Sequence, residues 1–331
     1  MHLPPLIIGT MARRGDDAGV RSAIYRGALD LGLRCFDTAP LYGFGEADRL
    51  LAAAIRDQPR DSIQILSKTG LRWQDGARGD RLFTFTDAAG LQRQVRKDSR
   101  PEAVRQDVED SLRRLGTDYL DLIQIHHPDE RTPIAETMGE LLALRAEGKV
   151  RQIGVSNFSE AQLAAAGHAL GSVRLASHQF EFNLLQRPTS MRWLDASVSA
   201  GIAVLAYSPL AGGALTRALE PVLGPVAEAH GIAPGMVPLC WVMGHPGVTS
   251  AITGVSSTAQ LEAQAAASAV RLSEAERQAL TEAFRGLQIE ASRPALTTRL
   301  RRRARTVAGA GLRAAGLSPS RLRRWLGMRR W

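Results

Sequence analysis

Cysteine and long apolar runs are both scarce in this chain of 331 residues. Its two cysteines, Cys35 and Cys240, lie far apart and outside any CxxC or Cys/His cluster, which argues against a disulfide framework and against a zinc site. No stretch of about 18 apolar residues is available to span a membrane. The segment MHLPPLIIGTMARR carries its arginines after a very short apolar run, which is the wrong order for a secretory signal. These absences predict a cytoplasmic protein.

Acidic residues are absent from the last part of the chain. Residues 291–331 hold twelve arginines and no Asp, Glu or Lys, and because the whole chain has a formal net charge of +9, the remainder carries −3. The positive charge therefore belongs to a tail behind a mildly acidic body, which argues against specific binding of nucleic acid. Leucine and tryptophan interleave with these arginines, as in amphipathic helices that contact anionic membranes. We expect residues 293–331 to contact the inner membrane surface peripherally or to bind an acidic protein; a solvated, partly disordered tail is the alternative.

The body has the composition of a globular protein, with 44% hydrophobic and 23% charged residues in the chain. Short apolar runs mostly alternate in it with helical patterns, which predicts parallel strands joined by right-handed crossovers and buried on both faces. The eight predicted strands are 6–9, 35–37, 63–67, 120–125, 153–155, 176–179, 203–206 and 250–252. We therefore predict an α/β fold, a (β/α)8 TIM barrel over residues 1–290 with a basic C-terminal helical or disordered tail over 291–331. A doubly wound open sheet is the alternative.

Helix signals separate the predicted strands. Between residues 100 and 114 apolar residues recur every four positions, which predicts an amphipathic helix. Ser99 with Glu102 predicts a capping box at its start, and Ser273 with Glu276 predicts another near the end of the body.

One connection is too long for an ordinary loop. About thirty residues separate Thr69 from Asp98, and they include Trp73, Phe83 and Phe85. Loops of this length in a compact domain are usually functional or disordered, so we predict a lid over a pocket. An incidental surface excursion is the alternative.

Polar residues fall at the predicted strand ends, where a barrel of this kind carries its catalytic groups. These residues are Asp37, Lys68, His126, Ser156, Asn157, Gln179 and Tyr207, and Tyr42 lies on the loop that follows Asp37. Taken singly, each has an ordinary structural explanation, such as a turn for Asp37 or a solvated charge for Lys68. Their convergence on one rim favours an active site.

Five segments extend this argument: FDTAPLYGFG, LSKTG, DLIQIHHPD, IGVSNFS and AYSPLAGG. In this order they resemble the successive signatures of the aldo-keto reductase family, and the similarity runs from Gly9 to about Leu280. The resemblance implies a (β/α)8 barrel that binds a nicotinamide dinucleotide without a Rossmann domain. It also implies an NAD(P)(H)-dependent oxidoreductase that interconverts an aldehyde or ketone, a sugar included, and the alcohol by hydride transfer. The glycines at 43 and 45 do not complete a G-x-G-x-x-G fingerprint.

The resemblance implies a catalytic tetrad of Tyr42, Asp37, Lys68 and His126. A carbonyl that accepts a hydride also needs a proton, and a free tyrosine with a pKa near 10 is a reluctant acid at neutral pH. We expect the Lys68 ammonium to lower the pKa of Tyr42, the proton donor and acceptor, while Asp37 holds the ammonium in place. His126 would orient the substrate oxygen. We expect His127 to point to the opposite side of its strand, and we predict no metal site.

The same matching implies the cofactor-binding residues. Ser156, Asn157 and Gln179 resemble the carboxamide-binding set, and Tyr207 resembles the ring that stacks on the nicotinamide. Ser208, Leu210 and Gly213 would contact the pyrophosphate, and Gly254, Ser256 and Gln260 correspond to the adenosine end. The remaining residues of this set are Gly9, Thr10, Met11 and Asp37.

The adenosine-end segment departs from the family pattern. Many relatives carry Lys or Arg there to bind the ribose 2′-phosphate, whereas residues 254–260 hold no cation, and Arg293 would have to supply one from outside. The resemblance favours NADP(H), and this departure makes NAD(H) the alternative.

A contrasting function is a cofactor-binding redox-sensing or scaffold subunit with little turnover, recruited through its basic tail. It differs from an enzyme in predicting cofactor binding without carbonyl reduction. The sequence does not name the substrate, although Trp73, Phe83, Phe85 and His127 predict an aromatic-lined pocket of some polarity.

Overall fold

The computed structural model describes residues 2–11, 17–86, 90–185, 187–211 and 220–291. The chain divides into two compact units, Met1–Thr281 and Glu282–Trp331. Of the second unit only residues 282–291 are described, and they form the end of helix α10 (Glu274–Ala291). The predicted tail contacts, Gly213 and Arg293 therefore lie outside the described residues.

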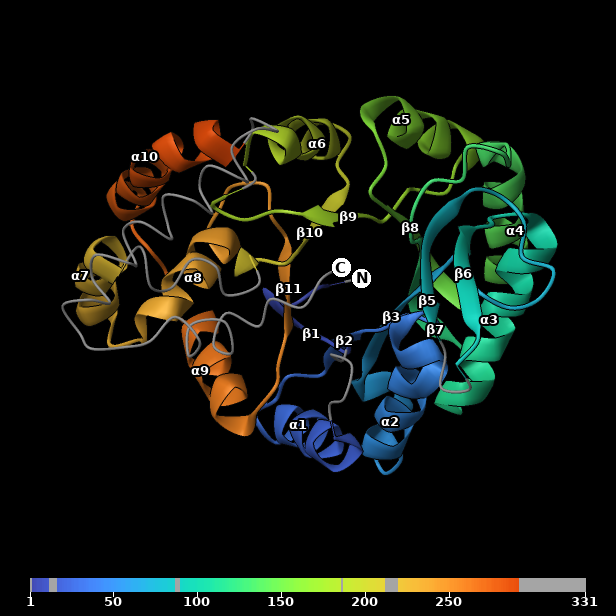
Figure 1. The fold of residues 1–331 in the computed structure, drawn as a ribbon, viewed down its shortest axis with the longest axis horizontal. Helices are drawn as coiled ribbons and strands as arrows, with labels where there is room; N and C mark the ends of the chain where they lie inside the picture. The colour runs from blue at the N-terminus through green and yellow to red at the C-terminus, as the bar shows by residue number, and fades with distance from the viewer. Residues whose placement is uncertain (1, 12–16, 87–89, 186, 212–219, 292–331) are drawn as a thin grey trace. The chain divides into compact units, whose positions relative to one another are not determined.

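Eight parallel strands close into a barrel in the first unit (Figure 1). In barrel order they are β1 (Leu6–Gly9), β11 (Ser250–Gly254), β10 (Ala203–Tyr207), β9 (Ser177–Glu181), β8 (Val150–Ser156), β7 (Leu120–Ile125), β3 (Gln64–Thr69) and β2 (Cys35–Asp37). Each predicted strand overlaps one of these. The predicted (β/α)8 barrel is confirmed, and the open-sheet alternative is wrong.

Helices surround the barrel, as Figure 1 shows. They are α1 (Ala18–Asp30), α2 (Glu46–Ile55), α3 (Pro101–Leu115), α4 (Ile134–Ala146), α5 (Glu160–Ala169), α6 (Arg187–Ser199), α7 (Glu220–His230), α8 (Val237–Met243) and α9 (Thr258–Ser268). The apolar stripe predicted for α3 packs into the core through Val104, Val108 and Leu112. A second buried cluster, which includes Leu66, Leu122 and Leu205, fills the barrel with alternate residues of the strands.

The start of α3 differs from the prediction. The prediction of a capping box at Ser99 is wrong, because the helix begins at Pro101 with Arg100 at its N-cap and no side-chain cap. Proline favours the first helical position, since its missing N–H is not needed there and its φ suits the helix. Glu102 instead pairs with Arg100. The second capping box is confirmed: Ser273 N donates to Glu276 Oε2 at 2.7 Å, and Glu276 N donates to Ser273 Oγ at 3.3 Å.

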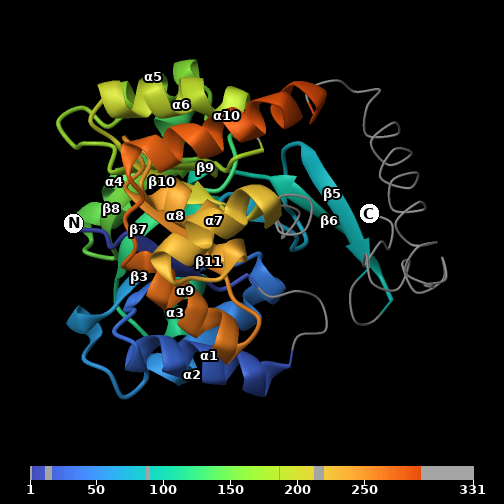
Figure 2. The ribbon, with the colours of Figure 1, turned by 90° about the vertical axis from the view of Figure 1, so that its left-hand side faces the viewer.

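The long connection after β3 forms a sheet of its own. Its antiparallel strands lie in the order β4 (Leu71–Arg72), β6 (Gln92–Lys97) and β5 (Arg81–Thr86). Figure 2 shows the β5–β6 hairpin beyond one end of the barrel. Because the connection leaves from the C-terminal end of β3, this hairpin lies at the barrel end that carries the candidate site.

Candidate functional site

The sheet register brings the predicted site residues to one rim. Asp37 on β2 is in register with Gly9 on β1, and Gly9 is in register with Gly254 on β11. On the other side of the barrel, Ser156 on β8 is in register with Gln179 on β9. The strands are parallel, so all of these residues lie near C-terminal strand ends.

Asp37 and Lys68 form a buried ion pair at this rim. The Lys68 Nζ donates to Asp37 Oδ1 at 2.5 Å, and the two side chains are 1% and 2% exposed. The same ammonium donates to the Thr38 carbonyl at 3.3 Å. Burial alone would lower the pKa of Lys68, but the charges of Asp37 and Tyr42 outweigh it and the pKa is raised. Lys68 is therefore an ammonium at neutral pH.

Tyr42 lies above this pair, at the start of a 3-10 turn (Tyr42–Gly45) that follows β2. The Lys68 Nζ is 5.0 Å from the centroid of the phenol ring. Burial raises the pKa of Tyr42 and the Lys68 charge lowers it, and burial wins. The expected lowering by Lys68 is present but is not the net direction. Tyr42 is thus a protonated phenol at neutral pH, which is the form that can donate a proton.

His126 faces Tyr42, with ring centroids 5.8 Å apart in an edge-to-face arrangement. Burial, together with the charges of Lys68 and His127, lowers the pKa of His126 well below its ordinary value, so the ring is neutral at neutral pH. A neutral imidazole can donate one hydrogen bond to a substrate oxygen without carrying charge.

The prediction that His127 points away from His126 is wrong. Both residues follow the end of β7, so strand alternation does not apply, and their rings lie 5.6 Å apart and nearly parallel. Burial and the charge of Lys97 lower the pKa of His127 to about 4. Among the described residues, no group of three His, Cys, Asp or Glu side chains is arranged to hold a metal ion.

The four residues assigned to nicotinamide binding are joined by hydrogen bonds. Asn157, at a φ of 61°, donates through Nδ2 to Ser156 Oγ at 2.9 Å and to the His126 carbonyl at 3.0 Å. The Tyr207 hydroxyl donates to Asn157 Oδ1 at 2.9 Å. Asn157 N donates to the Gln179 carbonyl at 2.9 Å, and Gln179 Nε2 donates to Asp37 Oδ2 at 2.9 Å, which connects this group to the ion pair. These amide and hydroxyl groups match the donors and acceptors of a nicotinamide carboxamide, so the donor set fits the group.

The other residues expected to bind cofactor continue around the rim. Thr10 N donates to the Asp37 carbonyl at 2.9 Å, whereas the neighbouring Met11 is 63% exposed. Ser208 is exposed at a φ of 52°, and Leu210 is half-buried on the same loop. Gly213, the remaining residue of this set, lies outside the described residues.

The adenosine-end segment forms a compact turn after β11. Gln260 Oε1 accepts hydrogen bonds from both Ser256 N and Ser256 Oγ, each at 2.9 Å. Arg21 of α1, 3% exposed, donates to the Val255 carbonyl at 2.8 Å. A guanidinium that sequence reasoning missed therefore lies beside this segment, where it holds the backbone. Gly254 is exposed and has no neighbour within 4 Å of the position a Cβ would take.

Aromatic rings connect the Tyr42 turn to the connection after β3. Phe44, two residues beyond Tyr42, stacks on Phe85 of β5 with ring centroids 4.1 Å apart. It also meets Trp73 edge-to-face at 5.2 Å, and Phe83 lies 6.5 Å from Phe85. Sequence reasoning assigned three of these rings to a pocket but missed Phe44, whose position next to the catalytic candidate was the available signal.

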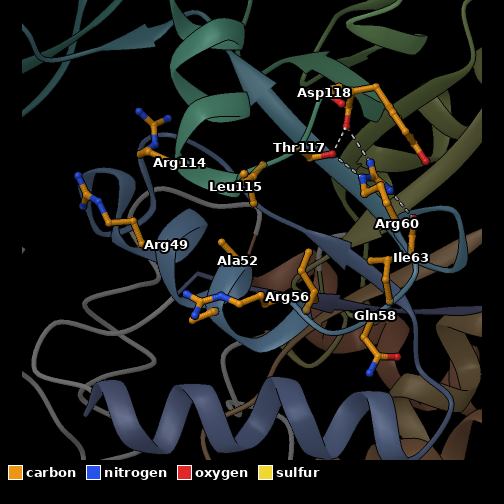
Figure 3. Close-up of a pocket in the computed structure, with 14 residues that line it drawn as sticks. Arg49, Ala52, Arg56, Gln58, Arg60, Ile63, Arg114, Leu115, Thr117 and Asp118 are labelled. Carbon is orange, nitrogen blue, oxygen red and sulfur yellow. Dashed lines mark hydrogen bonds between the residues drawn. The ribbon is translucent and has the colours of Figure 1, made fainter.

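A surface cavity of about 600 Å³ lies elsewhere, among side chains that precede β3 and β7 (Figure 3). Arginines line it, but three of them are engaged: Arg49 with Glu46, Arg114 with Asp48, and Arg60 with Asp121. Because it lies at the N-terminal ends of these strands and contains none of the rim residues, it is separate from the candidate site.

Comparisons with known proteins agree with the barrel fold and show the family. Residues 5–285 match the model of the Aldo/keto reductase family. The chain is 31% identical over 290 residues to a 6-dehydroglucose reductase of Novosphingobium aromaticivorans, a match that covers 83% of this chain and 89% of that one. It is 35% identical over 188 residues to an NADH-specific methylglyoxal reductase of Escherichia coli, covering 56% of this chain and only 55% of that one. Among solved structures, an aldo/keto reductase from Klebsiella pneumoniae in complex with NADP and acetate superposes with a TM-score of 0.68 at 30% identity, covering 85% of this chain and 92% of that one.

Proposed function

Because the chain belongs to the aldo/keto reductase family and is therefore an NAD(P)-dependent oxidoreductase of carbonyls and alcohols, we propose that it reduces a small polar aldehyde or ketone, with Tyr42 as the proton donor. The observation that carries this proposal is the buried Asp37–Lys68 pair beneath the Tyr42 ring, with the His126 ring edge-to-face against Tyr42. Relatives named for dehydroglucose and methylglyoxal support a sugar-derived carbonyl or a 2-oxoaldehyde as substrate.

Each tetrad member has a separate task in this proposal. The bound nicotinamide supplies the hydride. Tyr42 gives its proton to the carbonyl oxygen, and the Lys68 ammonium stabilises the phenolate that remains. Asp37 keeps Lys68 in reach and balances its charge in the buried site. His126, neutral because of its burial, donates a hydrogen bond that fixes the carbonyl oxygen near Tyr42.

The nicotinamide would be held by the hydrogen-bonded group at the ends of β8, β9 and β10, next to the tetrad. Ser156, Asn157 and Gln179 would bind its carboxamide, and Tyr207 would lie against one face of the ring. For the rest of the dinucleotide we propose Gly9, Thr10, Met11, Ser208, Leu210, Gly213, Gly254, Ser256 and Gln260. Since residues 254–260 offer no cation and Arg21 is bonded to a backbone carbonyl, we expect NADH to serve about as well as NADPH.

The test is cofactor oxidation by the full chain with methylglyoxal, an aldehyde sugar and a reactive aromatic aldehyde, each with NADH and NADPH in parallel. We expect turnover with at least one carbonyl and rates within about tenfold for the two cofactors, because a charge-assisted contact to the 2′-phosphate is missing. Tight cofactor binding without turnover of any carbonyl would contradict the proposal and favour a redox-sensing or scaffold subunit.

A separate proposal concerns what the basic tail contacts. Only the sequence supports the division into a 1–290 barrel and a 291–331 basic tail. The sequence is also the only support for a contact of residues 293–331 with an anionic membrane or an acidic protein. Among the described residues, no helix combines the length and apolarity needed to cross a bilayer. If the full chain and a chain cut at Pro294 are retained equally on anionic phospholipid vesicles, the membrane contact is ruled out.

A further inference from the structure

A row of residues crosses the inside of the barrel just below the rim. The register pairs Lys68 on β3 with Gln124 on β7, Gln124 with Gly154 on β8, and Gly154 with Ser177 on β9. The side chains of Gln124 and Ser177 are fully buried, and Lys68 is 1% exposed. A barrel interior is normally filled by apolar side chains, so a polar row next to the ion pair needs a physical reason.

Gly154 allows the row to connect across β8. A Cβ at this position would lie 2.2 Å from Ser177 Oγ and 3.1 Å from Gln124 Cγ, so no other residue fits without displacing them. The space left by the missing side chain is occupied by a hydrogen bond, in which Ser177 Oγ donates to Gln124 Oε1 at 3.2 Å. Ser177 therefore fixes the orientation of the Gln124 carboxamide.

The oriented oxygen of Gln124 faces Gln179. Gln179 Nε2 lies 3.5 Å from Gln124 Oε1 and donates to Asp37 Oδ2 at 2.9 Å. Asp37 thus has one oxygen on Gln179 and the other on Lys68. In the described part of the chain, Gln124 Nε2 is buried without a hydrogen-bond partner. An unpaired buried donor is unfavourable, so the orientation of this carboxamide is set by the contacts that Gln124 Oε1 makes with Ser177 and Gln179.

We propose that Gln124 is a positioning residue that acts through Gln179. Its oxygen turns the Gln179 amide toward Asp37 Oδ2, which leaves Oδ1 to Lys68 and keeps the ammonium beneath the Tyr42 ring. Gly154 leaves room for the Gln124 side chain, and the hydrogen bond from Ser177 holds that side chain in place. This inference rests on the proposed reduction, because it assigns Gln124 a role in the same proton transfer.

A double-mutant cycle distinguishes this role from ordinary packing. Gln124→Met keeps the length of the side chain and removes the acceptor, and we expect kcat at saturating cofactor to fall about fivefold while the KM of the carbonyl changes less than twofold. If Gln124 acts through Gln179, the variant carrying both Gln124→Met and Gln179→Met has the kcat of Gln179→Met alone. Effects that multiply would contradict the proposal. Thr137→Val, which removes a buried hydrogen bond of α4 to the Ser99 carbonyl, is the matched control, and its effect should combine independently.

A readout independent of turnover uses the lysines. The chain has only three, Lys68, Lys97 and Lys149, so a protein labelled with 15Nζ-lysine gives three assignable ammonium signals. We expect Gln124→Met and the milder Ser177→Ala to move the Lys68 signal and to leave those of Lys97 and Lys149 in place. An unmoved Lys68 signal overturns the inference. Absence of turnover in the wild-type protein overturns the proposed function, and the lysine signals then judge the role of Gln124 by themselves.

Discussion

Asp37 accepts a hydrogen bond on each of its carboxylate oxygens, and its charge affects the pKa values of Lys68 and Tyr42. One oxygen is bonded to Lys68 and the other to Gln179. The buried carboxylate helps to keep Lys68 charged, and the charge of Lys68 opposes the rise that burial imposes on the pKa of Tyr42. At the scale of single residues, the site is thus a protonated acid placed beside the cation that stabilises its conjugate base.

The proposed cofactor preference also depends on single residues. Ser256 is exposed in the segment that we propose to bind the adenosine end, and residues 254–260 of this segment contribute no cation. Ser256→Arg adds a guanidinium that can bind a 2′-phosphate, so we expect the ratio of kcat/KM for NADPH to that for NADH to rise at least about tenfold. Steady-state kinetics with both cofactors measure this ratio. Ser172→Arg, an equal charge at an exposed position before β9, should leave the ratio unchanged; an unchanged ratio in Ser256→Arg would show that this segment does not bind the ribose.

At the scale of elements, the β5–β6 hairpin is attached to the Tyr42 turn by the stack of Phe44 on Phe85. Phe44→Ala removes the stack and keeps a Cβ at the same φ of 55°. Because such a pair is worth about 0.5–1.5 kcal/mol, we expect the KM of the carbonyl to rise about three- to tenfold if the hairpin is a lid over the substrate. Leu82→Ala, at an exposed residue of β5 outside the stack, is the control. Equal KM values in wild type and Phe44→Ala would favour an incidental surface excursion.

Helix α3 contributes a buried carboxylate whose ionisation affects stability. Asp107 accepts hydrogen bonds from Thr69 Oγ1 at 2.9 Å and Gly70 N at 3.0 Å, which ties the helix to the end of β3. Burial raises the pKa of Asp107 to about 6, although the charge of Arg72 opposes it. Between pH 4 and pH 6 the folded state therefore binds more protons than the unfolded state, so the contribution of this group to the free energy of unfolding decreases as the pH rises.

Asp107→Asn removes that dependence. Relative to wild type, we expect the free energy of unfolding of the variant to increase by about 2 kcal/mol from pH 4 to pH 7, on top of any constant loss. Urea unfolding of both proteins at the two pH values measures the difference. A difference that does not change with pH would mean that Asp107 has an ordinary pKa in the folded protein.

Across the whole molecule, the pattern of apolar residues predicted more than the capping signals did. The eight strands were predictable because burial on both faces makes each one a short apolar run, and the strand-end rule then located Asp37, Lys68 and His126 together. The start of α3 was not predictable from the capping signal at Ser99, because the helix begins at Pro101. Gln124 escaped notice because it lies inside a strand, and only the cross-strand register reveals its neighbours. The net direction of the Tyr42 pKa depends on burial, which sequence alone does not supply.

The central claim is that Tyr42 donates the proton in carbonyl reduction, and its most direct test compares two tyrosine variants in one assay. Tyr42→Phe removes the acidic hydroxyl and keeps the ring, and Tyr119→Phe makes the same change where the ring lies between Arg60 and Arg151, at the start of β7. With any carbonyl that the wild type reduces, we expect kcat to fall about a hundredfold or more in Tyr42→Phe, since a positioned acid accelerates a reaction on the order of 10²–10⁴-fold. In Tyr119→Phe we expect kcat to stay within about twofold of wild type. A Tyr42→Phe protein that keeps wild-type turnover would contradict the account.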